Sequence, residues 1–455
     1  MFRTESYVIN NGQITVGKSG LYEHQNTSSF SQAGFTFNNG TFTNAGMTNI
    51  NTGFLENNGD FRNNAGQVRI GEGALFGNNR DTPFSTAAAA GVYIQEAGGK
   101  TRIDGGFDNR GSVSNEGTIT VGTTGAYTQS PSSSGLASTT RNAGTFQNEG
   151  RVSLSGPSSF FNTGRYVHRA SGTTEIGGTF VNLSGHMSNA GTITVGTTGE
   201  YIQDRLPGAG PGVPSGTTTN SGIFTNAGST FINAGTFINH GSIVNSGTFQ
   251  VAALGQIAGN GSYVQNAAAA RTIVNGTFAH NISLQAGSLS GTGIITGAVM
   301  NTGGVVQPGS SIVPGTLTLA NYTQGPTGRL DLKIGGLLAG SQYDVLKITG
   351  PAAFSGNLSV RLINGFTPGL GNTFNLLSCS LGCSGLNGGT GLALPSLSSG
   401  LAWLSGLTDG GNGFSLTVVA AASAPEPGTL LLIGSGFVGL LMLRRRRHGS
   451  CASHK

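Results

Sequence analysis

Residues 220–249 read NSGIFTNAGSTFINAGTFINHGSIVNSGTF, and this stretch decides the fold. The triplet Asn-x-Gly occurs five times in it, with glycines spaced 6, 7, 6 and 6 residues apart. Between the triplets, Phe, Ile, Val and Thr recur in short alternating runs, which suits a strand with one face buried. The stretch therefore predicts short strands joined by sharp corners.

Three such units make about 19 residues, enough for one coil of a parallel β-helix. Stacked coils place like residues above like residues, so we expect ladders of asparagine and stacks of phenylalanine. We also expect the Asn and Gly residues to give the corners a positive φ, which both residue types tolerate. The predicted fold is all-β: a β-solenoid with a β-rich C-terminal cap and a short C-terminal transmembrane helix.

Related repeats occur outside this stretch. The phrase Gly-x-Ile-Thr-Val-Gly begins at Gly12, Gly117 and Gly191, and each copy is followed by a tyrosine. A flexible Gly/Asn/Ser linker is one alternative, but the periodic Phe and Ile residues argue against it, because flexible linkers carry no periodic apolar residues. A propeller or sandwich is another, but its units run to about 8–12 residues.

The composition and the distribution of charge exclude some classes of binding partner. The chain has 455 residues, 79 of them Gly, and only 9% are charged. The net charge of +5 equals the charge of Arg444, Arg445, Arg446, Arg447 and Lys455, because no acidic residue follows Glu426. The rest of the chain is neutral overall, which argues against nucleic acid as a partner.

Residue composition and repeat pattern divide the chain into three parts: a repeat solenoid over residues 1–285, a more aliphatic region over 286–420, and a tail over 421–455. The middle part contains Pro314-Gly315, Tyr322-Thr-Gln324 and Tyr343-Asp-Val-Leu346 in succession. This succession resembles the C-terminal end of autotransporter passenger β-helices. The resemblance implies a closing region that caps the solenoid.

The tail has three parts in order: Pro425, Glu426 and Pro427, then an apolar run over 429–443, then Arg444 to Arg447. The apolar run is short for a hydrocarbon core of about 30 Å, and the arginines should stay on the cytoplasmic side and orient it. The tail resembles the PEP-CTERM sorting signal of Gram-negative bacteria. That resemblance implies an exosortase as partner, transient inner-membrane anchoring, and release to the cell surface or extracellular matrix.

A plain membrane anchor is the alternative for the tail. The N-terminus shows no signal-peptide core of about 7–15 apolar residues. We therefore expect an upstream signal peptide that is missing from this sequence.

Chemical sites are sparse in the sequence. Asp104 and Asp108 form a closely spaced carboxylate pair, and we interpret them as turn residues rather than as an acid/base or metal site. Cys379 and Cys383 predict a small-loop disulfide in an oxidising compartment. The seven histidines are dispersed, so the sequence predicts no metal site and no cofactor.

These observations predict a non-enzymatic surface or matrix protein associated with exopolysaccharide or biofilm. Two alternatives remain open. One is a β-helix polysaccharide lyase or hydrolase, and the other is a surface adhesin that stays anchored by its C-terminal helix.

Overall fold

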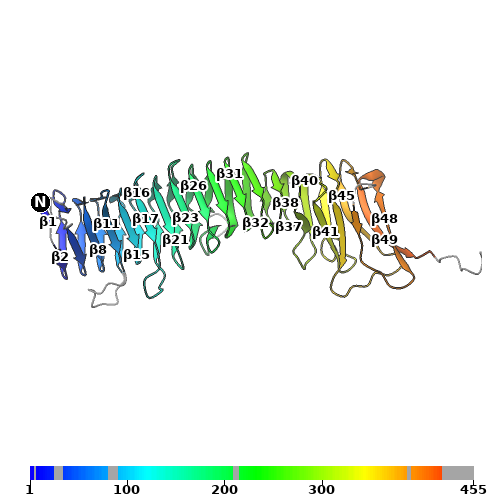
Figure 1. The fold of residues 1–455 in the computed structure, drawn as a ribbon, viewed down its shortest axis with the longest axis horizontal. Helices are drawn as coiled ribbons and strands as arrows, with labels where there is room; N and C mark the ends of the chain where they lie inside the picture. The colour runs from blue at the N-terminus through cyan, green and yellow to red at the C-terminus, as the bar shows by residue number, and fades with distance from the viewer. Residues whose placement is uncertain (5–6, 25–33, 80–90, 209–214, 387–390, 423–455) are drawn as a thin grey trace, which may run out of the picture.

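The computed structural model describes residues 1–4, 7–24, 34–79, 91–208, 215–386 and 391–422. Within them, 49 strands join into one continuous sheet, from β1 (Phe2–Thr4) to β49 (Gly413–Ala420). The sheet winds along a straight rod whose two ends are far apart (Figure 1). Most strands have four residues, as the repeat spacing predicts.

From β1 to β27, each strand pairs in parallel with the third strand after it; beyond that point some strands are long enough to span two faces, and the spacing of paired strands changes. For example, β16 (Thr118–Val121) lies between β13 (Lys100–Ile103) and β19 (Thr145–Asn148). One coil therefore contains three strands, and the rod has three faces. The described part of the chain is the parallel β-helix that the repeats predict.

We number the faces by their first strands. The first face begins with β1, the second with β2 (Tyr7–Asn10), and the third with β3 (Gln13–Val16). The first face continues through a regular series: β4 (Leu21–His24), β7 (Met47–Ile50), β10 (Gln67–Ile70), β13, β16, β19, β22 (Arg165–His168), β25 (His186–Asn189) and β28 (Thr217–Asn220).

The second and fourth residues of most strands fill the core, because successive side chains point to opposite faces of a strand. Aromatic rings of successive coils meet there. Phe42 stacks on Phe61 with ring centroids 4.7 Å apart, and Phe61 stacks on Tyr93 at 5.2 Å. The core is therefore a continuous column along the rod rather than one central cluster.

Asparagine side chains form ladders inside the rod, as expected. Each amide nitrogen donates to the amide oxygen of the asparagine in the next coil, at 2.6–2.9 Å. The longest ladders are Asn10, Asn38, Asn57, Asn78 and Asn109 on the second face, Asn115, Asn142, Asn162 and Asn182 on the third, and Asn189, Asn220 and Asn239 on the first.

The expected reason for the corner glycines is wrong. Of the five glycines in residues 220–249, only Gly235 has a positive φ. The others are needed because the coils stack closely: a Cβ at Gly241 would lie 2.0 Å from the carbonyl oxygen of Gly222. Gly235 lies within β30 (Ser229–Asn239), whose first residues pair with β27 on the third face and whose last residues pair with β28 on the first face, so the chain turns the expected corner inside one strand.

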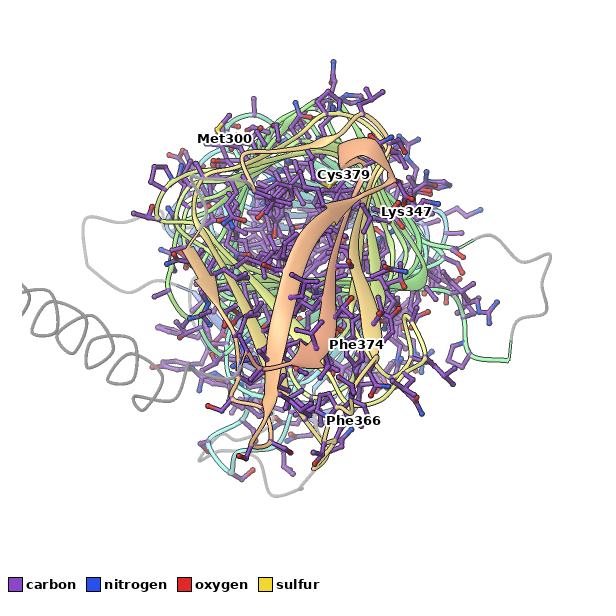
Figure 2. The ribbon with its side chains drawn as sticks, turned by 90° about the vertical axis from the view of Figure 1, so that its right-hand side faces the viewer. Met300, Lys347, Phe366, Phe374 and Cys379 are labelled. Atoms are coloured by element: carbon purple, nitrogen blue, oxygen red, sulfur yellow. A yellow bond between two sulfur atoms is a disulfide. The ribbon has the colours of Figure 1, made fainter. Side chains whose placement is uncertain are left out.

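The C-terminal end of the rod changes pairing. The described parallel ladder extends to β47 (Gly391–Ala393), and β49 pairs antiparallel with both β45 (Thr373–Cys379) and β48 (Leu401–Thr408). β48 and β49 lie across the end of the rod (Figure 2), and Trp403 of β48 packs against Phe374 of β45 with ring centroids 6.0 Å apart. The ladder passes residue 286 without interruption, so the division at 285/286 stays a prediction from composition.

The transmembrane helix expected over 429–443 lies outside the described residues. Among the residues that are described, no helix has the length and apolar character needed to cross a membrane.

Candidate functional site

The tail residues lie outside the part of the chain that the structure describes. These are Pro425, Glu426 and Pro427 of the processing motif, and Arg444, Arg445, Arg446 and Arg447 of the membrane-orienting cluster. Their roles therefore rest on sequence. The described chain ends just after β49, at the capped end of the rod, so the tail follows the cap directly.

Cys379 and Cys383 are joined by a disulfide, with their Cα atoms 5.4 Å apart. Both side chains are buried. Cys379 ends β45, and Cys383 begins β46 (Cys383–Ser384), which pairs with β43 (Ala352–Phe354). The disulfide therefore links β45, which pairs with β49 of the cap, to β46 in the last coils of the solenoid.

A groove of about 350 Å³ lies on the outer surface of the first face. Its walls and floor come from β7, β10, β13 and β16, and the outward side chains are the first and third of each strand. Arg69 lies directly opposite Arg102 in the parallel register, and Lys100 lies opposite Thr118. Three cations thus meet on two adjacent strands.

One carboxylate partly neutralises this groove. Asp104 forms a two-point ion pair with Arg102, at 2.8 and 2.9 Å, and its Oδ2 is 4.0 Å from Nε of Arg69. The Arg69 side chain stays 64% exposed. Within the described ranges, Lys100 has no hydrogen bond or ion pair through its side chain.

The sequence reasoning missed this cluster for a physical reason. Gln67 and Lys100 are neighbours in register although 33 residues separate them, because an insertion lies between the two coils. The usual coil spacing of 19 residues, seen between Asn38 and Asn57, does not align them. The shared pattern of Gln67-Val-Arg-Ile70 and Lys100-Thr-Arg-Ile103 is the signal that could have revealed it.

A second groove of about 530 Å³ lies on the third face. It runs over β34 (Arg271–Val274), β37 (Ser288–Gly291) and β39 (Val305–Pro308), and the loop over 309–315 forms one wall. Seven of its lining residues carry a hydroxyl or amide group, and Arg271 is its one charged residue. Arg361 donates to the carbonyl oxygen of Ser311 and holds that loop in place.

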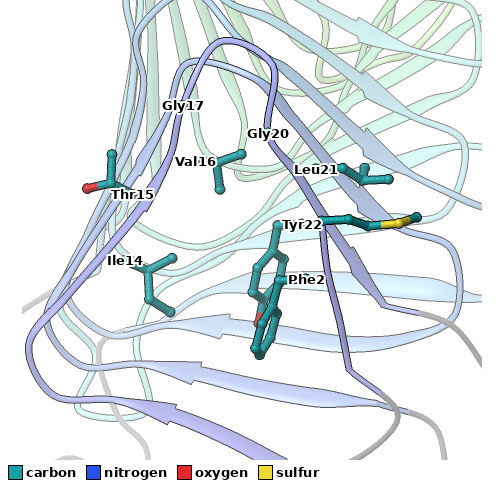
Figure 3. Close-up of a pocket in the computed structure, with 9 residues that line it drawn as sticks. Phe2, Ile14, Thr15, Val16, Gly17, Gly20, Leu21 and Tyr22 are labelled. Atoms are coloured by element: carbon teal, nitrogen blue, oxygen red, sulfur yellow. The ribbon is translucent and has the colours of Figure 1, made fainter.

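A third hollow, of about 310 Å³, lies at the first coil (Figure 3). Its lining is mostly apolar and includes Phe2, Ile14, Val16 and Tyr22. Phe2 stacks on Tyr22 with centroids 5.2 Å apart. Val16 and Tyr22 are core residues of the first described coil, whereas Phe2 is half exposed. No set of polar groups converges there that would orient a small ligand.

Asp104 and Asp108 do not form a paired-carboxylate site. Asp104 follows β13 at the edge of the first face, whereas Asp108 lies in β14 (Gly106–Asn109) on the second face. Asp108 pairs with Arg110 at 3.0 Å, so each carboxylate has a different arginine. Among the residues that the structure describes, no three His, Cys, Asp or Glu side chains gather as metal ligands would.

Asp344 has a structural role in the aliphatic region. It pairs with Lys333 at 2.6 Å, and both side chains are fully buried. The carboxylate also accepts hydrogen bonds from the main-chain nitrogens of Gly315 and Lys333, and Lys333 donates to the carbonyl oxygen of Pro308. A buried pair that is hydrogen-bonded on both sides fixes the arrangement of these coils.

Comparison with known proteins identifies one sequence motif and one structural likeness. Residues 423–447 match the model of the PEP-CTERM protein-sorting motif. No curated protein matches the chain. Among nine matching solved chains is a TibA fragment, residues 55–350, hyperglycosylated by TibC catalysis. It is 14% identical, with 86% of this chain and 97% of that chain covered and a TM-score of 0.26.

Because the identity and TM-score are this low, the fold assignment rests on the strand pairing described above and not on this likeness. The family match is specific, and it includes Pro425, Glu426, Pro427 and the arginine cluster. The chain is a parallel β-solenoid that carries a PEP-CTERM protein-sorting motif at residues 423–447, and it is thus an exported protein sorted through the membrane by an exosortase.

Proposed function

We propose that this protein is a non-enzymatic component of the cell surface or extracellular matrix that associates with exopolysaccharide after the exosortase has removed its tail. The observation that carries the proposal is the long outer surface of the rod. It presents Thr and Ser in strand register, and it is hollowed by two grooves whose linings include hydroxyl and amide groups. Such a surface suits many weak hydrogen bonds to sugar hydroxyls.

The proposal that the chain is not an enzyme rests on its carboxylates. Glycoside hydrolysis needs two carboxyl groups that flank one bond. The closely spaced pair Asp104 and Asp108 is divided between two faces, and an arginine holds each side chain. Incubation of the protein with host exopolysaccharide should therefore release no new reducing ends and no unsaturated sugars.

The first experiment is the C-terminal mass of the protein from the native host, measured in the medium, the envelope and the matrix fraction. Processing and sorting should give a chain that ends near Pro425 to Gly428, outside the cell and together with exopolysaccharide. Replacing Pro425, Glu426 and Pro427 by alanine should leave a full-length chain in the inner membrane. A wild-type chain that keeps Arg444 to Lys455 in the inner membrane would instead support a permanently anchored adhesin.

A further inference from the structure

The basic groove of the first face is an unusual feature of a nearly uncharged rod. Arg69 and Arg102 are exposed and lie opposite each other on neighbouring strands, about 4.8 Å apart along the rod. Like charges that face each other across strands destabilise a sheet. Asp104 offsets one of them, which leaves Arg69 partly and Lys100 wholly uncompensated.

Such local conflicts are expected at functional sites. The surroundings indicate the kind of ligand. Asn49, opposite Arg69, and Thr118 and Thr120 in the next coil supply amide and hydroxyl groups on both sides of the cations. These groups donate and accept hydrogen bonds as sugar hydroxyls require.

We propose that this groove binds an acidic polysaccharide through its carboxylate groups, with Arg69 and Lys100 as the anion-binding residues. This inference rests on the proposed function, because it names the chemical class of the exopolysaccharide. The guanidinium of Arg69 matches a carboxylate with two parallel donors, and the ammonium of Lys100 adds a compact charge. Asp104 fixes the Arg102 guanidinium and so shapes the groove.

The size of the charged area favours a uronic-acid polymer over nucleic acid. The cations of the groove lie on only two strands, and Glu96 and Glu116 lie at the corners that precede β13 and β16. A duplex would need a continuous basic stripe, since it carries a negative charge about every 1.7 Å. A sugar chain that carries a carboxylate on some residues needs only one or two cations, flanked by polar groups.

The test is binding of fluorescent oligogalacturonate to the full-length chain, measured by anisotropy at low and at physiological salt. We expect saturable binding that weakens as salt rises, because exposed charges are screened. The double variant Arg69→Gln/Lys100→Gln should bind at least tenfold more weakly. An uncharged glucan oligosaccharide of the same length should bind at least tenfold more weakly to the wild type.

Arg165→Gln is the matched control. Arg165 is exposed, and it occupies the outward position that Lys100 occupies three coils earlier in the same column. The Arg165→Gln variant should bind oligogalacturonate with the same affinity as the wild type. Equal affinity of the double variant, or tighter binding of duplex DNA than of oligogalacturonate, would overturn the inference.

The inference and the proposed function can fail separately. If the double variant is processed and enters the matrix fraction like the wild type, while its oligogalacturonate affinity is also unchanged, the groove is not the glycan site but the proposed function stands. If the wild type never leaves the inner membrane, the proposed function fails whatever the groove binds in solution.

Discussion

Buried asparagine is the residue that most distinguishes this molecule. A buried amide is costly unless its hydrogen bonds are made, and here the coils make them. Asn142 donates to Asn162 at 2.7 Å and to the main-chain oxygen of Arg165 at 3.1 Å, and it accepts from Asn115 at 2.6 Å. Each ladder asparagine thus ties its coil to the coils on both sides.

Asn142→Ala should lower the free energy of unfolding by about 2–4 kcal/mol, because it leaves buried partners unpaired and a small cavity. Urea denaturation followed by circular dichroism measures the loss. Ser188→Ala, at an exposed position in β25, is the control and should change stability by less than about 0.5 kcal/mol. An equal effect of the two variants would show that the ladder contributes nothing to stability.

His24 gives the rod a dependence on pH. Burial lowers the pKa of His24 to about 4, from its ordinary value of 6.5. Below pH 6.5 the unfolded chain binds a proton that the folded chain does not, so stability falls as the pH falls from 6.5 toward 4. Between pH 7 and pH 5.5, the free energy of unfolding should therefore fall by about 1 kcal/mol less in His24→Gln than in the wild type.

Urea titrations at several pH values between 7 and 5.5 measure this difference. Asn142→Ala serves as the comparison, because it destabilises the chain without removing an ionisable group. Its curve should run parallel to that of the wild type. A His24→Gln curve that is also parallel would contradict the assignment of this pH dependence to His24.

At the scale of the coil, the corners set how closely the strands stack. A Cβ at Gly59 would lie 2.1 Å from the carbonyl oxygen of Gly40 in the coil before it. Both groups are main-chain atoms of paired coils, so no side chain can move aside. The corner glycines are thus required by the close approach of two backbones, whatever their own φ.

Gly59→Ala should cost about 1–3 kcal/mol, because the two coils must move apart at that corner. Gly12→Ala is a control at the equivalent corner of the first coil, where no atom lies within 4 Å of the added Cβ. It should be close to neutral in the same thermal or urea unfolding experiment. A neutral Gly59→Ala would show that the coils tolerate a wider spacing.

Much of this element-level design was visible in the sequence. The alternation of Phe224 and Phe249 with polar neighbours predicts which side chains fill the core, and both are fully buried. The asparagine ladders followed from the same repeat. The basic groove did not, since an insertion of variable length between coils hides which residues become neighbours, and only the register shows that Arg69 lies opposite Arg102.

At the scale of the whole molecule, the rod is a one-dimensional array. Strands pair with the coils before and after them, so each coil is stabilised mainly by its two neighbours. Damage in the middle should therefore separate the array into two parts that unfold at different points, rather than weaken it uniformly.

Phe160→Ala tests this view. Phe160 is fully buried and stacks on Phe180 at 4.9 Å, with Phe146 and Tyr166 against its edges. Its loss should cost about 3–5 kcal/mol. Hydrogen exchange should show faster opening in the coils around residue 160 and little change around residues 320–360. A uniform increase along the chain would mean that the rod unfolds as one cooperative unit.

The direction of the strand pairing also determines how the rod responds to pulling. The hydrogen bonds between coils run along the long axis, so tension between the two ends is transmitted through every coil in series. A rod held at its C-terminal end and drawn by a polymer gripped near residues 69–102 would yield one coil at a time. Each released coil of about 19 residues adds roughly 60 Å of slack. The repeat would then act as an extensible tether that lengthens under flow and rewinds when the pull stops.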